Sequence, residues 1–244
     1  MSWPRAVPPI DIELDDAQAL AVAHRVLARE GWQENLSGHI TVDRGDGTYL
    51  CTPWGRWWEE VCASDVMTVD AAGTPTAGPW DVTPAVHLHT EIHRVRPDAT
   101  VVVHGHPEAA TILACIGAEP VIAHQNACIF DGELVTVDEY AGTVEDSGTG
   151  AALAAQIGNA SGILLAHHGA IVTAPTLAEA CYKAATYERM CRFTLAALHA
   201  GRPLLPLPDA GRTALKAELR ANAPDAYWRG AARVALRTDR TVLD

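Results

Sequence analysis

Apolar residues recur at helical spacing along several stretches of the chain. The clearest stretch, Asp15–Glu30, opens with two acidic residues and is followed by Gly31, as an amphipathic helix would be. A second helix is expected over Thr83–Val95, with Thr as its cap and Pro in its first turn. Four more helices are expected over Glu108–Ile116, Asp146–Ile157, Leu177–His199 and Gly211–Ala221.

Short runs of alternating or β-branched residues lie between these stretches and predict strands. The run Thr100–His106 is bounded by Asp98 and Pro107, which is the pattern of a buried strand. Six other strands are expected over His39–Val42, Thr48–Thr52, Val66–Val69, Pro120–Ala123, Leu134–Val137 and Gly162–His167. Helices and strands interleave without a repeat or a long linker. We therefore expect one α/β domain over residues 1–244, with a core from about 15 to 200 and a helical tail over 201–244.

Composition and charge exclude several classes of function. The chain has 30 acidic and 18 basic residues and a formal net charge of -12, whereas sequence-independent nucleic-acid binding needs clustered Lys and Arg. No apolar run approaches the roughly 20 residues that span a bilayer. The first residues place Pro and acidic side chains where a signal peptide has its apolar core. We expect a cytoplasmic protein with a small-molecule substrate and neither a nucleic-acid nor a membrane partner.

Cysteine and lysine usage narrows the chemistry further. The six cysteines form no Cys-x-x-Cys pair, which fits buried thiols better than a zinc knuckle or a disulfide framework. The two lysines, Lys183 and Lys216, lie in segments that look helical, so Schiff-base chemistry and a P-loop are not expected.

Histidines, by contrast, gather at the ends of two predicted buried strands. His104 and His106 are two residues apart, so they face the same side of a strand and can offer a metal two nitrogen ligands. The other strand ends in His167-His168-Gly169. The plainer interpretation is that these histidines merely cap strands, but buried polar rings would then need several partners at once.

Together these segments resemble the class II aldolase/adducin head-domain family. The resemblance covers roughly residues 15–200 and rests on Ser37-Gly38-His39-Ile40-Thr41-Val42, Thr52-Pro53-Trp54-Gly55, the pattern of His87–His106, Asp138-Glu139-Tyr140-x-Gly142 and Leu164–Gly169. It implies a single three-layer α/β domain, with a mixed, largely antiparallel central sheet and helices on both faces. It also implies a homotetramer with active sites at the subunit interfaces.

In the metal-dependent members of this family, three histidines hold one divalent ion. They correspond here to His104, His106 and His168, and the expected cofactor is one zinc, manganese or iron ion. His167 is expected to face away, because adjacent strand residues alternate faces.

The sequence departs from the family pattern at the substrate end of the site. The sugar-phosphate aldolases and epimerases carry a proton-transferring acid four residues before the position of His89, and Ala85 stands there. Their phosphate grip is also changed, to His39, Trp54 and Thr83-Pro84. These departures predict a substrate without phosphate and a reaction other than sugar-phosphate cleavage.

The favoured function is that of a metal-dependent decarboxylase acting on a hydroxylated aromatic or related carboxylate. Such a reaction needs a Lewis acid and a proton donor, but no strong base. His89 is the first candidate for the donor and His39 the second. Tyr140 is the rival candidate, because the resemblance implies a tyrosine here that reaches a neighbouring subunit's site and donates a proton. Trp54 and Thr83 are expected to bind the substrate, since tryptophan suits a flat apolar ring.

Three other functions stay open. A non-haem iron oxygenase of an aryl pyruvate-like substrate would use the same histidines, although the usual iron triad includes a carboxylate. An aldolase acting on a non-phosphorylated substrate is a further alternative. A non-catalytic adducin-like module is the last, and the complete histidine set argues against it.

Overall fold

The computed structural model describes residues 6–140 and 142–244. Its centre is an open eight-stranded sheet in the order β4-β3-β2-β1-β5-β8-β7-β6. The strands are β1 (His39–Asp43), β2 (Thr48–Cys51), β3 (Met67–Asp70), β4 (Pro75–Ala77), β5 (Val101–Gly105), β6 (Leu134–Val137), β7 (Gly162–Leu165) and β8 (Gly169–Ala174). Neighbouring strands in the described chain are antiparallel except β6 and β7, which are parallel.

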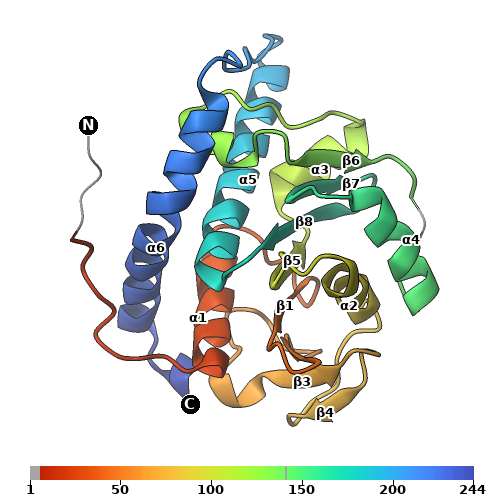
Figure 1. Ribbon diagram of the computed structural model, residues 1–244, viewed down its shortest axis with the longest axis vertical. Coiled ribbons are helices and arrows are strands. Elements are labelled where there is room, and N and C mark those ends of the chain that lie inside the picture. The colour runs from red at the N-terminus through yellow and green to blue at the C-terminus, as the bar shows by residue number, and fades with distance from the viewer. Residues whose placement is uncertain (1–5, 141) are drawn as a thin grey trace.

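Helices cover both faces of this sheet (Figure 1). The α-helices are α1 (Asp16–Arg29), α2 (Val86–Val95), α3 (Glu108–Ile116), α4 (Ser147–Ile157), α5 (Leu177–His199) and α6 (Arg212–Thr238), and short 3-10 helices span Ala63–Asp65, Gln125–Phe130 and Thr241–Leu243. One apolar core joins α1, α3 and α5 to one face of the sheet, and a second joins α2 and α4 to the other face. The predicted three-layer α/β fold with a mixed, largely antiparallel sheet is confirmed.

Local chemistry accounts for several element boundaries. Helix α1 begins with a capping box, in which Asp15 Oδ1 accepts from the Gln18 backbone N–H at 2.8 Å and Gln18 Oε1 accepts from the Asp15 N–H at 3.2 Å. Strand β5 is buried along its whole length between β1 and β8, which agrees with its unbroken apolar run. Helix α2 begins at Val86 rather than Thr83, because Thr83 Oγ1 accepts from the Ala85 N–H at 3.3 Å in the turn before it.

Two strand predictions are wrong because the real partners lie far away in sequence. Residues 120–123 form a loop, in which the Ile122 carbonyl accepts from the Leu207 N–H at 2.8 Å and the Val121 N–H donates to Thr194 Oγ1 at 3.0 Å. The strand expected to reach His167 ends at Leu165, and the chain turns back into β8. Strand β8 was not predicted at all.

The C-terminal helix is much longer than the predicted Gly211–Ala221. Helix α6 continues through Pro224 to Thr238 because residues beyond the predicted end, among them Ala232 and Leu236, are buried in a cluster with α1. Figure 1 shows α6 lying alongside α1 and α5. In the part of the chain that the structure describes, no helix combines the length and hydropathy needed to cross a membrane.

Candidate metal centre and active-site cleft

The β5–β8 pairing brings the two histidine motifs together. His104 lies in β5, His106 directly follows that strand, and His168 lies in the turn that opens β8. The register places His104 opposite Ile171 and Gly105 opposite Ala170, so the turn comes beside the end of β5. The candidate ligand atoms of the three histidines all lie within 4.8 Å of one another.

Hydrogen bonds leave the correct nitrogen free on two of these rings. The Nδ1–H of His104 donates to the Ala170 carbonyl at 3.1 Å, and the Nδ1–H of His106 donates to Glu34 Oε2 at 2.5 Å. The Nε2 of each neutral ring therefore carries a lone pair, and that of His106 is buried without a partner. A second partner of this kind is usual for metal-ligating histidines.

Burial also keeps two of the three histidines in their ligating form. Desolvation lowers the pKa of His104 well below its usual value and that of His168 to about 4. Metal ligands must be neutral imidazoles, so these two rings need no proton release near pH 7. Three imidazole nitrogens at this spacing, one of them buried and unpartnered, fit a divalent metal ion.

The turn before β8 decides which of the adjacent histidines joins the cluster. His167 has φ 55° in the left-handed region and is exposed, whereas His168 points into the cluster. The choice of His168 therefore agrees with the prediction, but the reason is a turn rather than strand alternation. Gly169 permits the close approach, since a Cβ there would collide with the Gly105 carbonyl oxygen.

A cleft of about 260 Å³ opens beside the cluster. It is lined by Ser37, Gly38, His39, Trp54, Thr83, Ala85, Leu88, His104, His106, Tyr140, Gly142, Thr143, Val144 and His168. None of these described lining residues is acidic, and none is Lys or Arg. The cleft thus gathers every residue predicted for the site except His89.

His39 lies against Ala85, the residue that stands where the family has its acid. Its Nε2–H donates to the carbonyl of Ala85 at 3.2 Å, so its Nδ1 is the nitrogen left to meet a molecule in the cleft. The ring stacks on His89 with centroids 4.0 Å apart and meets His104 edge-on at 5.4 Å. Burial lowers the pKa of His39 to about 4.

His89 lies behind His39, in a buried hydrogen-bond chain. His93 Nδ1–H donates to the Ala99 carbonyl at 2.7 Å, so its Nε2 accepts from the Thr41 hydroxyl, also at 2.7 Å. The Thr41 oxygen must then accept from His89 Nδ1–H at 2.8 Å. His89 Nε2 is therefore unprotonated, and it is buried without a partner. His93 is itself buried, and its ring stacks on Tyr49 with centroids 4.7 Å apart.

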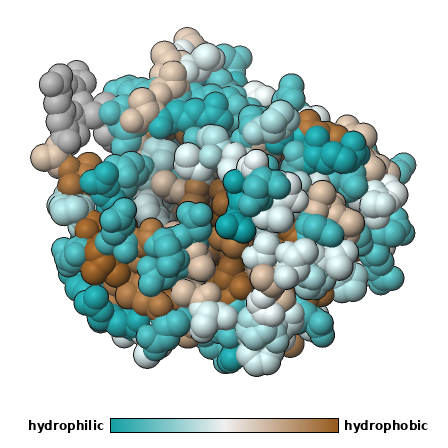
Figure 2. Space-filling view, turned by 60° about the horizontal axis from the view of Figure 1, so that its bottom comes forward, coloured by the Kyte–Doolittle hydropathy of each residue, from teal (hydrophilic) through white to brown (hydrophobic). Residues whose placement is uncertain are grey.

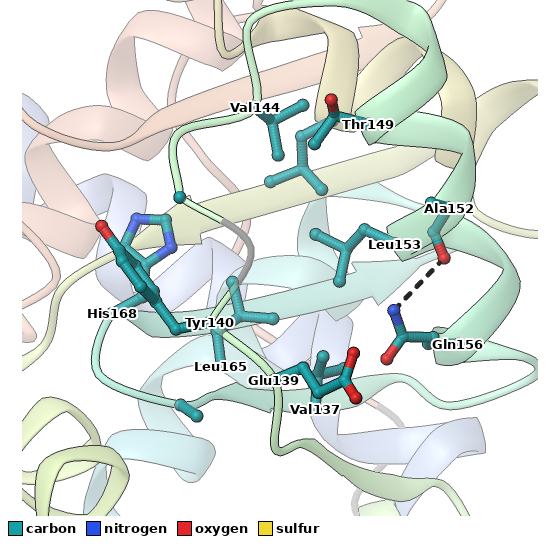
Figure 3. A pocket seen from close by; sticks show the side chains of 13 residues that line it. Val137, Glu139, Tyr140, Val144, Thr149, Ala152, Leu153, Gln156, Leu165 and His168 are labelled. Carbon is teal, nitrogen blue, oxygen red and sulfur yellow. Dashed lines mark hydrogen bonds between the residues drawn. The ribbon is translucent and has the colours of Figure 1, made fainter.

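Tyr140 and the tryptophans surround the cleft unequally. Tyr140 follows β6 and lines the cleft of its own chain, beside His168 (Figure 3). Trp54 lines the cleft and is half-exposed, whereas Trp58 is fully buried in the core. Trp80 is turned to Asp65, to which its Nε1–H donates at 2.7 Å. Only Trp54 among the described tryptophans lines the cleft.

Sequence reasoning missed Glu34 and Thr41, which act only through contacts across the fold. Glu34 is 72 positions before His106, and Thr41 is 48 positions before His89. Neither residue stands at a sequence spacing from these histidines that is typical of a metal-ligand partner or of a hydrogen-bond chain. The Ser-Gly-His-Ile-Thr segment that carries the resemblance was the available signal for Thr41.

The fold and site define a mixed α/β protein with a candidate three-histidine metal centre at the edge of its sheet. The family model "Class II Aldolase and Adducin N-terminal domain" matches residues 18–195. This is well over half of the 244 residues, so the chain belongs to that family.

Relatives in this family carry out different reactions. The chain is 30% identical over 208 residues to 3,4-dihydroxyphthalate decarboxylase of Arthrobacter keyseri, covering 79% of this chain and 83% of the relative. It is 32% identical to 5-methylthioribulose-1-phosphate/5-deoxyribulose-1-phosphate aldolase of Rhodospirillum rubrum, covering 78% and 85%. It is also 32% identical to 4-hydroxy-3-prenylphenylpyruvate oxygenase/4-hydroxy-3-prenylbenzoate synthase of Streptomyces roseochromogenus subsp. oscitans, covering 74% and 67%.

Solved structures show the same fold. L-fuculose 1-phosphate aldolase from Glaciozyma antarctica PI12 superposes with a TM-score of 0.82 at 22% identity, covering 93% of this chain and 91% of that one. At this identity the likeness establishes the fold.

Proposed function

We propose that this protein is a divalent-metal-dependent lyase that removes carbon dioxide from a non-phosphorylated, hydroxylated aromatic or related carboxylate. The observation that carries the proposal is the cleft beside the three histidines. Its described lining has no carboxylate to abstract a proton from a sugar carbon and no cation to hold a phosphate. The decarboxylase relative supports the same reaction class.

Different residues of the cleft are proposed to hold the metal ion and to bind the substrate. A divalent ion held by His104, His106 and His168 would supply a Lewis acid to the substrate oxygens. Trp54 and Leu88 offer apolar surface to a flat ring, and the Thr83 hydroxyl offers a hydrogen bond. The site thus combines polar groups at one end with apolar walls.

His39 is the proton carrier that this geometry favours. Its Nδ1 takes the proton of the substrate hydroxyl, and the carbon–carbon bond to the carboxylate then breaks with release of carbon dioxide. The proton returns from His39 to the ring carbon, where it forms the new carbon–hydrogen bond with the electron pair left behind. The sequence ranked His89 first and His39 second, and we propose the reverse order, because His39 lines the cleft and His89 does not. Tyr140 is the rival donor, because it lines the same cleft.

The test uses purified protein loaded in turn with zinc, manganese and iron. It is supplied with hydroxybenzoates and 3,4-dihydroxyphthalate, and carbon dioxide release and oxygen uptake are recorded together. We expect metal-dependent release of carbon dioxide without oxygen uptake. His39→Phe keeps the stacked ring but removes its nitrogens, and should slow turnover about 10²–10⁴-fold with the metal retained. His199→Ala, at the exposed end of α5, is the matched control.

Other outcomes would replace the proposal. One oxygen consumed per product would establish the oxygenase reaction, and robust turnover of a fuculose or ribulose phosphate would establish sugar-phosphate chemistry. Aldol cleavage of a non-phosphorylated substrate would make the protein a lyase of the other type. A metal-free protein without any of these activities would be an adducin-like module.

We also propose a cytoplasmic homotetramer with active sites at the subunit interfaces. Three tryptophans are exposed, Trp54 in the cleft lining and Trp57 and Trp80 outside it, which supports their burial by another subunit. The cysteines in the described chain are all free, which agrees with a reducing compartment. Tyr140 belongs to the cleft of its own chain in this proposal, not to a neighbour's.

A further inference from the structure

A second cavity opens directly beside the metal cleft, between α4, α2 and the segment that follows β6 (Figure 3). The two cavities share Leu88, Tyr140, Gly142, Val144 and His168 as lining residues. The second cavity adds Val137, Glu139, Thr149, Ala152, Leu153, Gln156, Leu165 and Ala166. A molecule that reaches the candidate metal ligand His168 from the cleft therefore also borders this cavity.

The walls of this side pocket are aliphatic. Leu88, Val137, Val144 and Leu165 are buried side chains that form its inner part, and Leu153 of α4 is half-buried against them. Figure 3 shows Val137, Val144, Leu153 and Leu165 together on one side of Tyr140 and His168. A polar group placed here would lose its water without finding a partner.

Two polar residues of the lining, Gln156 and Thr149, have partners of their own. Gln156 is exposed, and its Nε2 donates to the Ala152 carbonyl at 3.5 Å. The Thr149 hydroxyl donates to Asp146 at the start of α4. Glu139 is exposed. The buried part of the side pocket therefore suits a hydrocarbon group, and Gln156 and Glu139 lie at the exposed part, where water can reach them.

We propose that the side pocket binds a short hydrocarbon substituent on the ring of the substrate. This inference rests on the proposed function, and it adds the class of substrate: an aromatic carboxylate that carries a hydrophobic side group. The shared wall of Tyr140 and His168 places such a group within reach when the polar end of the ring lies at the histidine cluster. Burial of apolar surface then tightens binding of substituted rings over bare rings.

The test compares two probes, 4-hydroxybenzoate and 3-propyl-4-hydroxybenzoate, by calorimetric titration of the zinc-loaded protein. Each buried methylene is worth about fourfold in Kd. We expect the propyl compound to bind at least about tenfold more tightly. In Ala152→Phe a phenyl ring enters the pocket, and this advantage should fall to less than about twofold. Ala155→Phe makes the same change at an exposed position of α4 outside the pocket lining and should retain the advantage.

Each adverse result has a distinct meaning. Equal affinity of the two probes for the unmodified protein would overturn the proposal, and would indicate that another subunit covers the side pocket. An advantage that survives in Ala152→Phe, or a propyl compound that does not bind, would overturn it as well. This experiment measures binding and not turnover. Tighter binding of the propyl compound, without any release of carbon dioxide, would therefore contradict the proposed reaction but support the role of the side pocket.

Discussion

Three histidines around the cleft are each held by a different partner, and the partner decides which ring nitrogen stays free. Ala170 and Glu34 occupy the Nδ1 atoms of His104 and His106, and Ala85 occupies the Nε2 of His39. The Nε2 atom is thereby left free on His104 and His106, and the Nδ1 atom on His39. These are the atoms to which the proposed function gives metal binding and proton transfer.

The first prediction concerns the metal ligands. Replacing His104, His106 or His168 by Ala should reduce bound divalent metal to near zero, because two nitrogens hold such an ion far less firmly than three. His167→Ala is the matched control and should keep its metal, since that side chain is exposed outside the cluster. Elemental analysis after dialysis gives the answer. Metal retained in His168→Ala but lost in His167→Ala would show that the ligand was wrongly chosen.

A second prediction concerns the carboxylate behind His106. Glu34→Ala removes the acceptor of the His106 Nδ1–H and should weaken zinc binding about 10–100-fold. A competition titration against a chelating dye measures the change. Glu119→Ala removes an equal charge from an exposed loop and should have no effect. Equal zinc affinity in the two variants would mean that Glu34 does not orient the ligand.

The buried chain through Thr41 makes a prediction about a proton. His89 should carry its proton on Nδ1, and long-range ¹⁵N–¹H NMR of the histidine rings reports this tautomer directly. Thr41→Ser keeps the hydroxyl and should keep the tautomer. Thr41→Val leaves the Nδ1–H of His89 without an acceptor and the Nε2 of His93 without a donor. It should lower the free energy of unfolding by about 1–3 kcal/mol. A proton found on His89 Nε2 would refute the chain.

At the scale of elements, the approach of β8 to β5 builds the candidate metal centre. The turn after β7 brings His168 to the end of β5, and Gly169 lets the start of β8 lie against the Gly105 carbonyl. A Cβ on Gly169 would also meet His106 Cδ2 at 2.7 Å. Strand packing and the spacing of the histidines therefore depend on the same glycine.

Gly169→Ala should damage the centre without touching a ligand. The added methyl group pushes β8 away from β5, so we expect at least about tenfold weaker zinc binding and a loss of about 1–3 kcal/mol in the free energy of unfolding. Gly230→Ala in α6 is the control. A Cβ on Gly230 would lie 4.0 Å from Arg233 Nη2, so it would meet no steric clash, and Ala has a higher helix propensity than Gly. Calorimetric titration and urea unfolding provide the two measurements. Unchanged zinc affinity in Gly169→Ala would contradict this account.

At the scale of the whole molecule, buried neutral histidines link stability to pH. Burial lowers the pKa of His24 and of His93 to about 4, against 6.5 for an exposed histidine. Between these values the unfolded chain binds protons that the folded chain does not. The free energy of unfolding should therefore fall as the pH falls from about 6.5 to about 4, by about 1.4 kcal/mol per pH unit for each such histidine.

Urea unfolding of the metal-free protein between pH 7.5 and 4.5 measures this slope. His24 is suited to a test because its ring bonds to Leu20 and Thr52 on the α1 side, away from the cleft. His24→Gln should make the decline shallower by one histidine's contribution, whatever its effect on stability at pH 7.5. A slope equal to that of the unmodified protein would show that His24 is not neutral and buried in solution.

The amino-acid sequence by itself determined the parts of this protein that depend on neighbours along the chain. The capped amphipathic pattern of Asp15–Glu30 predicted α1, the apolar run before His104 predicted β5, and helices α3 and α5 were predicted with their observed bounds. Local hydrogen bonding and side-chain periodicity suffice for such features because the contacts involved span only a few residues. The spacing of His104 and His106 marked them as candidate ligands, whereas His168 was added from the resemblance to the family.

Only the tertiary structure decided the rest, because those contacts join distant segments. Strand β8 and the turn at His167 depend on pairing with β5, and the loss of the strand predicted over Pro120–Ala123 depends on Thr194 and Leu207. The order of His39 and His89 within the site also follows from packing, since one ring covers the other. Spacing in sequence places residues on a helix or strand, but the depth of a side chain beneath its neighbours is set by how those elements come together.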